Sequence, residues 1–136
     1  MNTPTPLIEV EKLEAWYGRR RILHGVDFRV NAGEIRVIMG GSGSGKSTLL
    51  RHMLGLNRPA GGTIKLFGVD MARASEREKL DVRKRIGVSF QGGALLTSMT
   101  VGDNVALPLR EHTRLDEQTI RIMTGIKLEV VNLGGF

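Results

Sequence analysis

The segment Gly40-Gly41-Ser42-Gly43-Ser44-Gly45-Lys46-Ser47 is the feature that most limits how this chain can fold. It matches the pattern G-x-x-x-x-G-K-[ST], in which a glycine-rich loop joins a buried strand to a helix. Glycine has no Cβ, so the main chain of such a loop can curl closely around a ligand. We therefore expect a loop whose backbone N–H groups point inward at phosphate.

The residues at the end of this P-loop, or Walker A, pattern have distinct expected roles. Lys46 supplies a mobile charge that can reach β- and γ-phosphates, and the Ser47 hydroxyl is a hard oxygen ligand suited to Mg²⁺. Thr48 adds a further candidate contact to phosphate, and the start of the helix adds its positive dipole end. A nucleoside triphosphate with Mg²⁺ is therefore the expected ligand, and the loop alone does not choose among kinases, GTPases and transport ATPases. The alternative is a flexible Gly-Ser linker that contains a lysine by chance.

The sequences on either side of the loop argue against the linker. Glu34 to Met39 is nearly continuous in apolar residues, which predicts a central strand buried on both faces. After the loop, Leu49, Leu50, Met53 and Leu54 share one helical face, and Gly55 stands where a left-handed C-cap would end the helix. The predicted unit is therefore strand, loop and helix.

Other elements are predicted from alternation and from capping residues. Half-buried strands are expected at Leu7 to Leu13, Val26 to Val30 and Gly62 to Gly68, and an apolar strand at Ile86 to Phe90. Helices are expected from the capping box of Ser75 and Glu78 to near Arg85, from Thr100 and Asp103 to a stop at Pro108, and over Asp116 to Val131. The order is antiparallel β first, then α/β, then helices.

Composition limits the class of protein further. The chain has 136 residues, of which 40% are hydrophobic and 25% charged, as in a single globular domain. It has no cysteine, which excludes disulfide frameworks and Cys-ligated zinc. His24, His52 and His112 lack the spacing of metal ligands, so no metal besides Mg²⁺ is expected. No apolar run approaches the roughly 18 to 20 residues that cross a bilayer, and we expect a cytoplasmic chain.

The net charge of +6 leaves nucleic-acid binding as a weaker alternative. Its basis is two basic runs, Arg19 to Arg21 and Arg83 to Arg85. Few aromatic residues accompany these runs, although stacking on bases needs them. We therefore expect no nucleic-acid partner.

With these motifs, the chain resembles the N-terminal part of an ABC transporter nucleotide-binding subunit. The resemblance implies an α/β P-loop NTPase fold: an antiparallel β subdomain, the P-loop strand and helix, and the start of a helical subdomain. It divides this partial domain, 1–136, into an antiparallel part with the A-loop (1–33), part of the P-loop core (34–90), and the Q-loop with the first helices (91–136). The chain would be truncated before the signature and Walker B.

The resemblance also implies roles for two residues outside the loop. Tyr17 matches the A-loop aromatic that stacks on adenine, with the adjacent Trp16 as the alternative. Gln91 matches the Q-loop glutamine, whose amide can contact Mg²⁺ or water beside Ser47.

A narrower resemblance is to the ATPase of the bacterial phospholipid-trafficking system that maintains outer-membrane lipid asymmetry, also described as a toluene-tolerance transporter. The segments that resemble it are Phe90 to Leu95, Asn104 to Thr113 and Lys127 to Val131. The implied function is ATP binding and hydrolysis coupled to phospholipid transport across the Gram-negative envelope. The implied partners are a second ATPase subunit and a transmembrane permease, with the ATPase on the inner face of the inner membrane.

Parts that the family uses for hydrolysis are missing from the sequence. It has no L-S-G-G-type signature, no apolar strand ending in Asp-Glu and no switch histidine, and Leu133-Gly134-Gly135 lacks the serine of a signature. Gln91 is therefore the only catalytic-type residue, and we expect the isolated chain to be inactive. The alternative function is a nucleotide-binding module or regulator that never hydrolyses.

Overall fold

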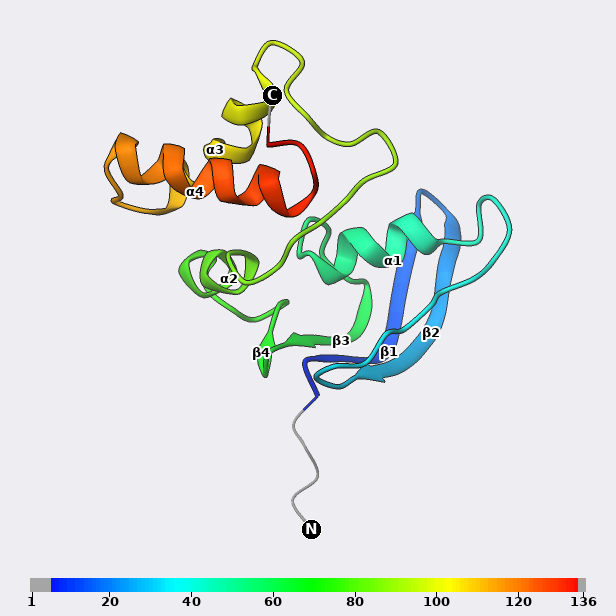
Figure 1. Ribbon diagram of the computed structural model, residues 1–136. Coiled ribbons are helices and arrows are strands. Elements are labelled where there is room, and N and C mark those ends of the chain that lie inside the picture. Colours follow the sequence, from blue (N-terminus) through cyan, green and yellow to red (C-terminus); the bar gives the residue numbers. More distant parts are fainter. Residues whose placement is uncertain (1–5, 135–136) are drawn as a thin grey trace. The chain divides into compact units, whose positions relative to one another are not determined.

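The computed structural model describes residues 6–134. After Ile86 the chain divides into two compact units (Figure 1). The described part of the first unit contains a four-stranded sheet and two helices, and that of the second contains two helices.

The first unit is built on an antiparallel sheet with the strand order β2-β1-β3-β4. The strands are β1 (Ile8–Tyr17), β2 (Arg20–Val30), β3 (Gly61–Leu66) and β4 (Val69–Asp70). β1 and β2 are longer than alternation predicts because irregularities in their pairing interrupt the pattern. At one of them Lys12 has a φ of +46°, and its N–H donates to Asp27 Oδ1 at 2.8 Å.

The core of the first unit lies between this sheet and its two helices, α1 (Lys46–Met53) and α2 (Glu76–Arg83). The predicted capping box is confirmed, since Ser75 and Glu78 each accept from the other's backbone N–H. The buried cluster consists of apolar side chains from β1, β2, β3, α1 and α2, together with Met71 in the turn after β4: Val10, Leu13, Ala15, Leu23, Leu49, Ile64, Leu66, Met71 and Val82. The packing of α1 on this sheet fixes the end of the glycine-rich loop that leads into α1.

Two predicted strands are wrong. Glu34 to Met39 forms no strand, and two of its apolar residues, Ile35 and Met39, are 91% and 87% exposed. Ile86 to Phe90 forms none either, and Val88 is 40% exposed. A central strand needs hydrogen-bonding neighbours on both edges. No strand among residues 6–134 pairs with either segment, so their apolar sequence is not sufficient to make them strands.

The second unit is a pair of packed helices, α3 (Val101–His112) and α4 (Glu117–Val130). Both predicted starts are confirmed, because Thr100 accepts from the Asp103 N–H and Asp116 from the Thr119 N–H. The buried positions are Ala106, Ile120, Thr124 and Leu128.

The predicted stop at Pro108 is wrong, since α3 continues through this residue to His112. Proline removes one backbone hydrogen bond but leaves the remaining helix free to form if other contacts hold it. Arg110, which follows Pro108, supplies such contacts. It donates hydrogen bonds to Asp103, which precedes the proline in α3, and to Glu117 on α4. No helix among residues 6–134 is both long and apolar enough to cross a bilayer.

Candidate nucleotide-binding site

The glycine-rich loop leads directly into α1, and Gly45 is the N-cap of that helix. No side chain caps this end. The first N–H groups of a helix have no partner within the helix, and together with the dipole they favour an anion. The loop therefore meets the physical requirements for binding phosphate at this position.

Gly45 is required here by both its backbone and its surroundings. Its φ is +96°, a conformation that residues with a Cβ rarely adopt. A Cβ on Gly45 would lie 2.9 Å from Ile22 Cγ2 and 3.0 Å from Leu23 Cδ2, both on β2. The missing side chain therefore lets the loop pack directly against the second strand of the sheet.

The ammonium of Lys46 lies inside the curve of the loop. Its Nζ donates to the Gly40 carbonyl at 2.6 Å, to the Gly41 carbonyl at 2.8 Å and to Ser44 Oγ at 3.4 Å. All three acceptors are neutral, and no carboxylate among the described residues forms an ion pair with Lys46. The loop therefore carries an uncompensated positive charge that an incoming phosphate can meet.

Most of the remaining loop residues are exposed, so a ligand can reach them from solvent. A Cβ on Gly40 would lie 2.6 Å from Ser44 Oγ, so glycine allows the close return of the loop on itself. Thr48 is half-buried in the first turn of α1. The other predicted contacts are solvent-exposed: Gly41, Ser42, Gly43 and Ser47. The whole set Gly40 to Thr48 is thus brought together at one end of α1.

The pairing of β1 with β2 indicates that the two candidate aromatic residues, Trp16 and Tyr17, lie on opposite faces of the sheet. Ala15 pairs with Leu23, whose side chain adjoins Gly45. Tyr17 is two residues beyond Ala15 and so projects from the same face of the sheet, whereas Trp16 projects from the opposite face. Tyr17 is 84% exposed and Trp16 52% exposed. Only Tyr17 therefore shares a sheet face with the glycine-rich loop.

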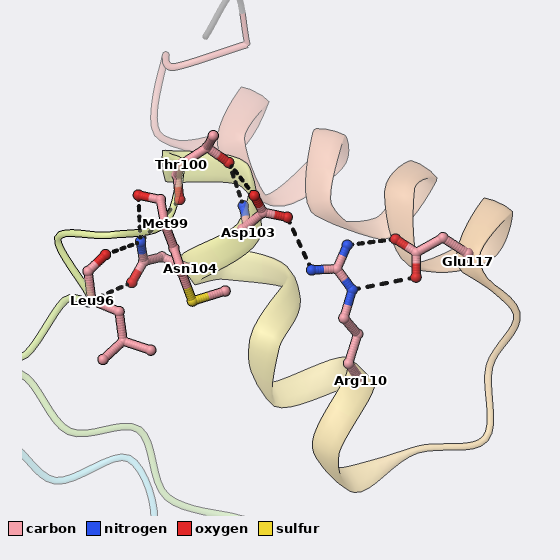
Figure 2. Close-up of polar contacts among 7 residues, drawn as sticks. All are labelled: Leu96, Met99, Thr100, Asp103, Asn104, Arg110 and Glu117. Carbon is pink, nitrogen blue, oxygen red and sulfur yellow. Dashed lines mark hydrogen bonds and ion pairs between the residues drawn. The ribbon is translucent and has the colours of Figure 1, made fainter.

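Gln91 belongs to the second unit, where it is exposed in a turn that the Gly93 N–H closes onto the Phe90 carbonyl at 2.8 Å. Its place beside Ser47 therefore stays a prediction. The loop that follows is fastened to α3 by Asn104, as Figure 2 shows. Asn104 Oδ1 accepts from the Leu96 N–H at 2.8 Å, and its Nδ2 donates to the carbonyls of Leu96, Met99 and Thr100 at 3.1, 3.3 and 2.9 Å.

Asn104 is a residue that motif reasoning did not single out. A side chain that bonds backbone four to eight residues earlier leaves no periodic signal in a sequence. The neighbouring Arg110 donates to Asp103 at 3.0 Å and to Glu117 at 3.3 Å (Figure 2). Hydrogen bonds from Thr100 and then Arg110 lower the pKa of Asp103, and the bond from Arg110 lowers the pKa of Glu117.

Comparison with known proteins decides the family. The family model described as ABC transporter matches residues 23–132, which include the glycine-rich loop, α1 and Gln91. The chain belongs to the ABC transporter family. The family resemblance and the fold class expected from the sequence are thereby confirmed, although the strands at Glu34 to Met39 and Ile86 to Phe90 are not formed.

Two ABC relatives are similar over nearly the whole chain. One is the intermembrane phospholipid transport system ATP-binding protein MlaF of Haemophilus influenzae, 47% identical over 95% of this chain and 49% of that protein. The other is named "Probable ribonucleotide transport ATP-binding protein mkl", from Mycobacterium leprae, and is 44% identical over 94% of this chain and 37% of that protein. The chain thus spans half or less of these relatives.

Solved ABC structures resemble the fold as well. A dimeric ATP-binding cassette in a post-hydrolysis state, bound to ADP and Pi, superposes with a TM-score of 0.78 at 27% identity. The match covers 90% of this chain and 56% of that one. cbiO1 of Clostridium perfringens, part of an ABC transporter complex, gives a TM-score of 0.75 at 28% identity over 91% of this chain and 49% of the other.

Proposed function

We propose that this chain binds Mg·ATP through residues 40–48 and forms the ATP-binding part of an ABC transporter ATPase. The observation that supports this most is the Lys46 ammonium, held inside the glycine-rich loop by neutral oxygens alone. A phosphate oxygen carries negative charge, so it can replace these neutral acceptors and form an ion pair with the ammonium. In this proposal Ser47 and Gln91 hold Mg²⁺, and Tyr17 stacks on adenine.

The test is calorimetric titration of the chain with Mg·ATP, comparing Lys46→Ala with the parent. A hydrogen bond to a charged group contributes roughly 1.5 to 3 kcal/mol, so the variant should bind about ten- to a hundredfold more weakly. Lys84→Ala is the matched control, because Lys84 is a lysine at the end of α2 whose nearest carboxylate oxygen, on Asp81, is 3.8 Å away. Equal binding by Lys46→Ala and the parent would refute the site.

We also propose that these 136 residues alone do not turn over ATP. Hydrolysis needs a water oriented in line with the γ-phosphate, usually by a carboxylate or an equivalent group. Lys46, Ser47 and Gln91 can position phosphate and Mg²⁺, but they supply no such group. Phosphate release should therefore stay at the Lys46→Ala background, and steady turnover that Lys46→Ala abolishes would contradict the proposal.

For the transported substrate we propose phospholipid. The support is the 47% identity to MlaF and the segments Phe90 to Leu95 and Asn104 to Thr113. The name of the mycobacterial relative makes ribonucleotide the competing class. In this proposal the whole transporter contains a second ATPase subunit and a permease, with the ATPase on the cytoplasmic side of the inner membrane.

The whole transporter reconstituted in vesicles, with an ATPase that also contains the parts for hydrolysis that these 136 residues lack, distinguishes the two substrate classes. Phospholipid, and no ribonucleotide, should move in an ATP-dependent way, and the movement should be lost in Lys46→Ala. Movement of ribonucleotide alone would refute the phospholipid assignment without affecting the ATP site. A protein that binds ATP but never hydrolyses it in the reconstituted transporter would indicate the alternative function of a regulatory nucleotide-binding module.

A further inference from the structure

The hairpin that joins β1 to β2 presents a basic side chain beside Tyr17. Tyr17 pairs directly with Arg20 across the hairpin, and Trp16 pairs with Arg21. Directly paired residues project from the same face of a sheet with their Cβ atoms roughly 4.5 to 5.5 Å apart. Arg20 therefore shares a face with Tyr17, and Arg21 lies on the other face with Trp16.

The two arginines differ in their partners as well as their faces. Arg21 donates to Glu14 at 2.6 Å, and Glu14 is on the face of Trp16. Arg20 is exposed, and it forms no ion pair with any residue between 6 and 134. Arg19, in the turn of the hairpin, is also exposed and forms no ion pair with a described residue. Of the two arginines that pair with β1, the one without an ion pair is thus Arg20, on the same face as the glycine-rich loop.

The distance along β2 connects Arg20 to the loop. Gly45 packs against Ile22 and Leu23, which follow Arg20 by two and three residues. The pairing with β1 passes from Leu23 to Arg21 and skips Ile22, so β2 is irregular here. The regular rise of about 3.3 Å per residue therefore gives an upper limit of roughly 7 to 10 Å for the distance along the strand from Arg20 to that contact. In Figure 1 the hairpin tip and the loop before α1 lie at the same end of the first unit, in agreement with the packing of Gly45 on β2. A side chain as long as arginine can cover much of this distance.

We propose that Arg20 is a nucleotide-binding residue that contacts the ribose and α-phosphate between a base on Tyr17 and the phosphates in the loop. This inference rests on the proposed function, because it assumes that ATP occupies residues 40–48. A guanidinium presents several donors in a rigid plane and pairs well with phosphate oxygens. Its contact lies on the part that ATP and ADP share, whereas Lys46 meets the β- and γ-phosphates.

Calorimetric titration with Mg·ATP and Mg·ADP separates the two residues. Arg20→Ala should weaken ATP and ADP by the same factor, about tenfold, as expected for one charge-assisted hydrogen bond. Arg20→Lys should recover part of the loss, because it keeps the charge without the planar donors. Arg21→Ala is the matched control, since it removes the same side chain one residue further on and from the opposite face. It should bind both nucleotides as the parent does, and the melting temperature of each variant checks folding.

Several results would overturn the inference. If Arg20→Ala binds like the parent while Lys46→Ala binds weakly, Arg20 does not contact the nucleotide and the proposed function stands. If Arg21→Ala loses as much affinity as Arg20→Ala, the effect is one of net charge and not of position. If the parent itself binds neither nucleotide, the proposed function fails and this inference fails with it.

Discussion

Removing the side chain of Asn104 should release the loop between Gln91 and α3. The amide of Asn104 bonds both the N–H and the carbonyl of Leu96, as well as the carbonyls of Met99 and Thr100. An amide has only two N–H hydrogens, so the three carbonyl contacts count as two bonds, and the Leu96 N–H makes a third. With a net contribution of about 0.7 kcal/mol per hydrogen bond, in the lower half of the usual range, three bonds give about 2 kcal/mol.

Amide hydrogen exchange measures this effect at its site. A loss of about 2 kcal/mol against opening of the loop corresponds to a roughly 30-fold faster exchange of the Leu96 amide in Asn104→Ala. Gln118→Ala, a change of similar size on the exposed start of α4, should leave the Leu96 amide unchanged. Equal exchange of Leu96 in Asn104→Ala and in the parent would refute the argument that this side chain fastens the loop.

Three further outcomes follow from the fold. Gly62→Ala should destabilise the first unit by more than about 2 kcal/mol, because φ is +81° and a Cβ would lie 2.3 Å from the Lys12 carbonyl; Gly61→Ala, whose Cβ would meet Glu14 at an ordinary 3.5 Å, should be mild in the same denaturant titration. The chain should bind a hydrophobic dye, since apolar side chains of the segment Glu34 to Met39 are exposed, and a dye-silent monomer would contradict this. Hydrogen bonds from Ser75 hold the pKa of Glu78 below its ordinary 4.5. The capping box therefore stabilises α2 fully above pH 4.5, and this stabilisation is lost as the pH falls through the lower pKa of the folded state. Amide exchange at Ser75 should accelerate over that acid range, and Glu78→Gln should remove this pH dependence.

Features with local causes could be predicted from the sequence. The capping box at Ser75 needs only Glu78 three residues later, and the alternation at Ile64 and Leu66 already marks the buried face of β3. The glycine-rich loop is predictable for the same reason, because its glycines, Lys46 and Ser47 lie within eight consecutive residues. The packing of Gly45 on Ile22 and Leu23 appears only in the fold. Local chemistry therefore specified α1, α2, β3 and the starts of α3 and α4.

Features that depend on a distant partner could not be predicted in this way. The apolar run before the loop resembles a buried strand, but a strand forms only where another strand pairs with it, and none among residues 6–134 does. Pro108 was expected to stop α3, yet Arg110 anchors the turn beyond it to Asp103 and to Glu117 on the next helix. The sheet faces on which Trp16 and Tyr17 lie likewise depend on the pairing of β1 with β2.

The central claim is that the backbone of the glycine-rich loop holds the phosphates of ATP, and amide NMR of the chain titrated with Mg·ATP tests it most directly. We expect saturable shifts centred on the N–H groups of Gly43, Gly45, Lys46 and Ser47, because these donors would exchange solvent for phosphate oxygens. Adenosine, which lacks phosphate, should leave these amides nearly unmoved. Saturable binding of Mg·ATP that shifts amides elsewhere and leaves those of Gly43 to Ser47 unchanged would contradict the account.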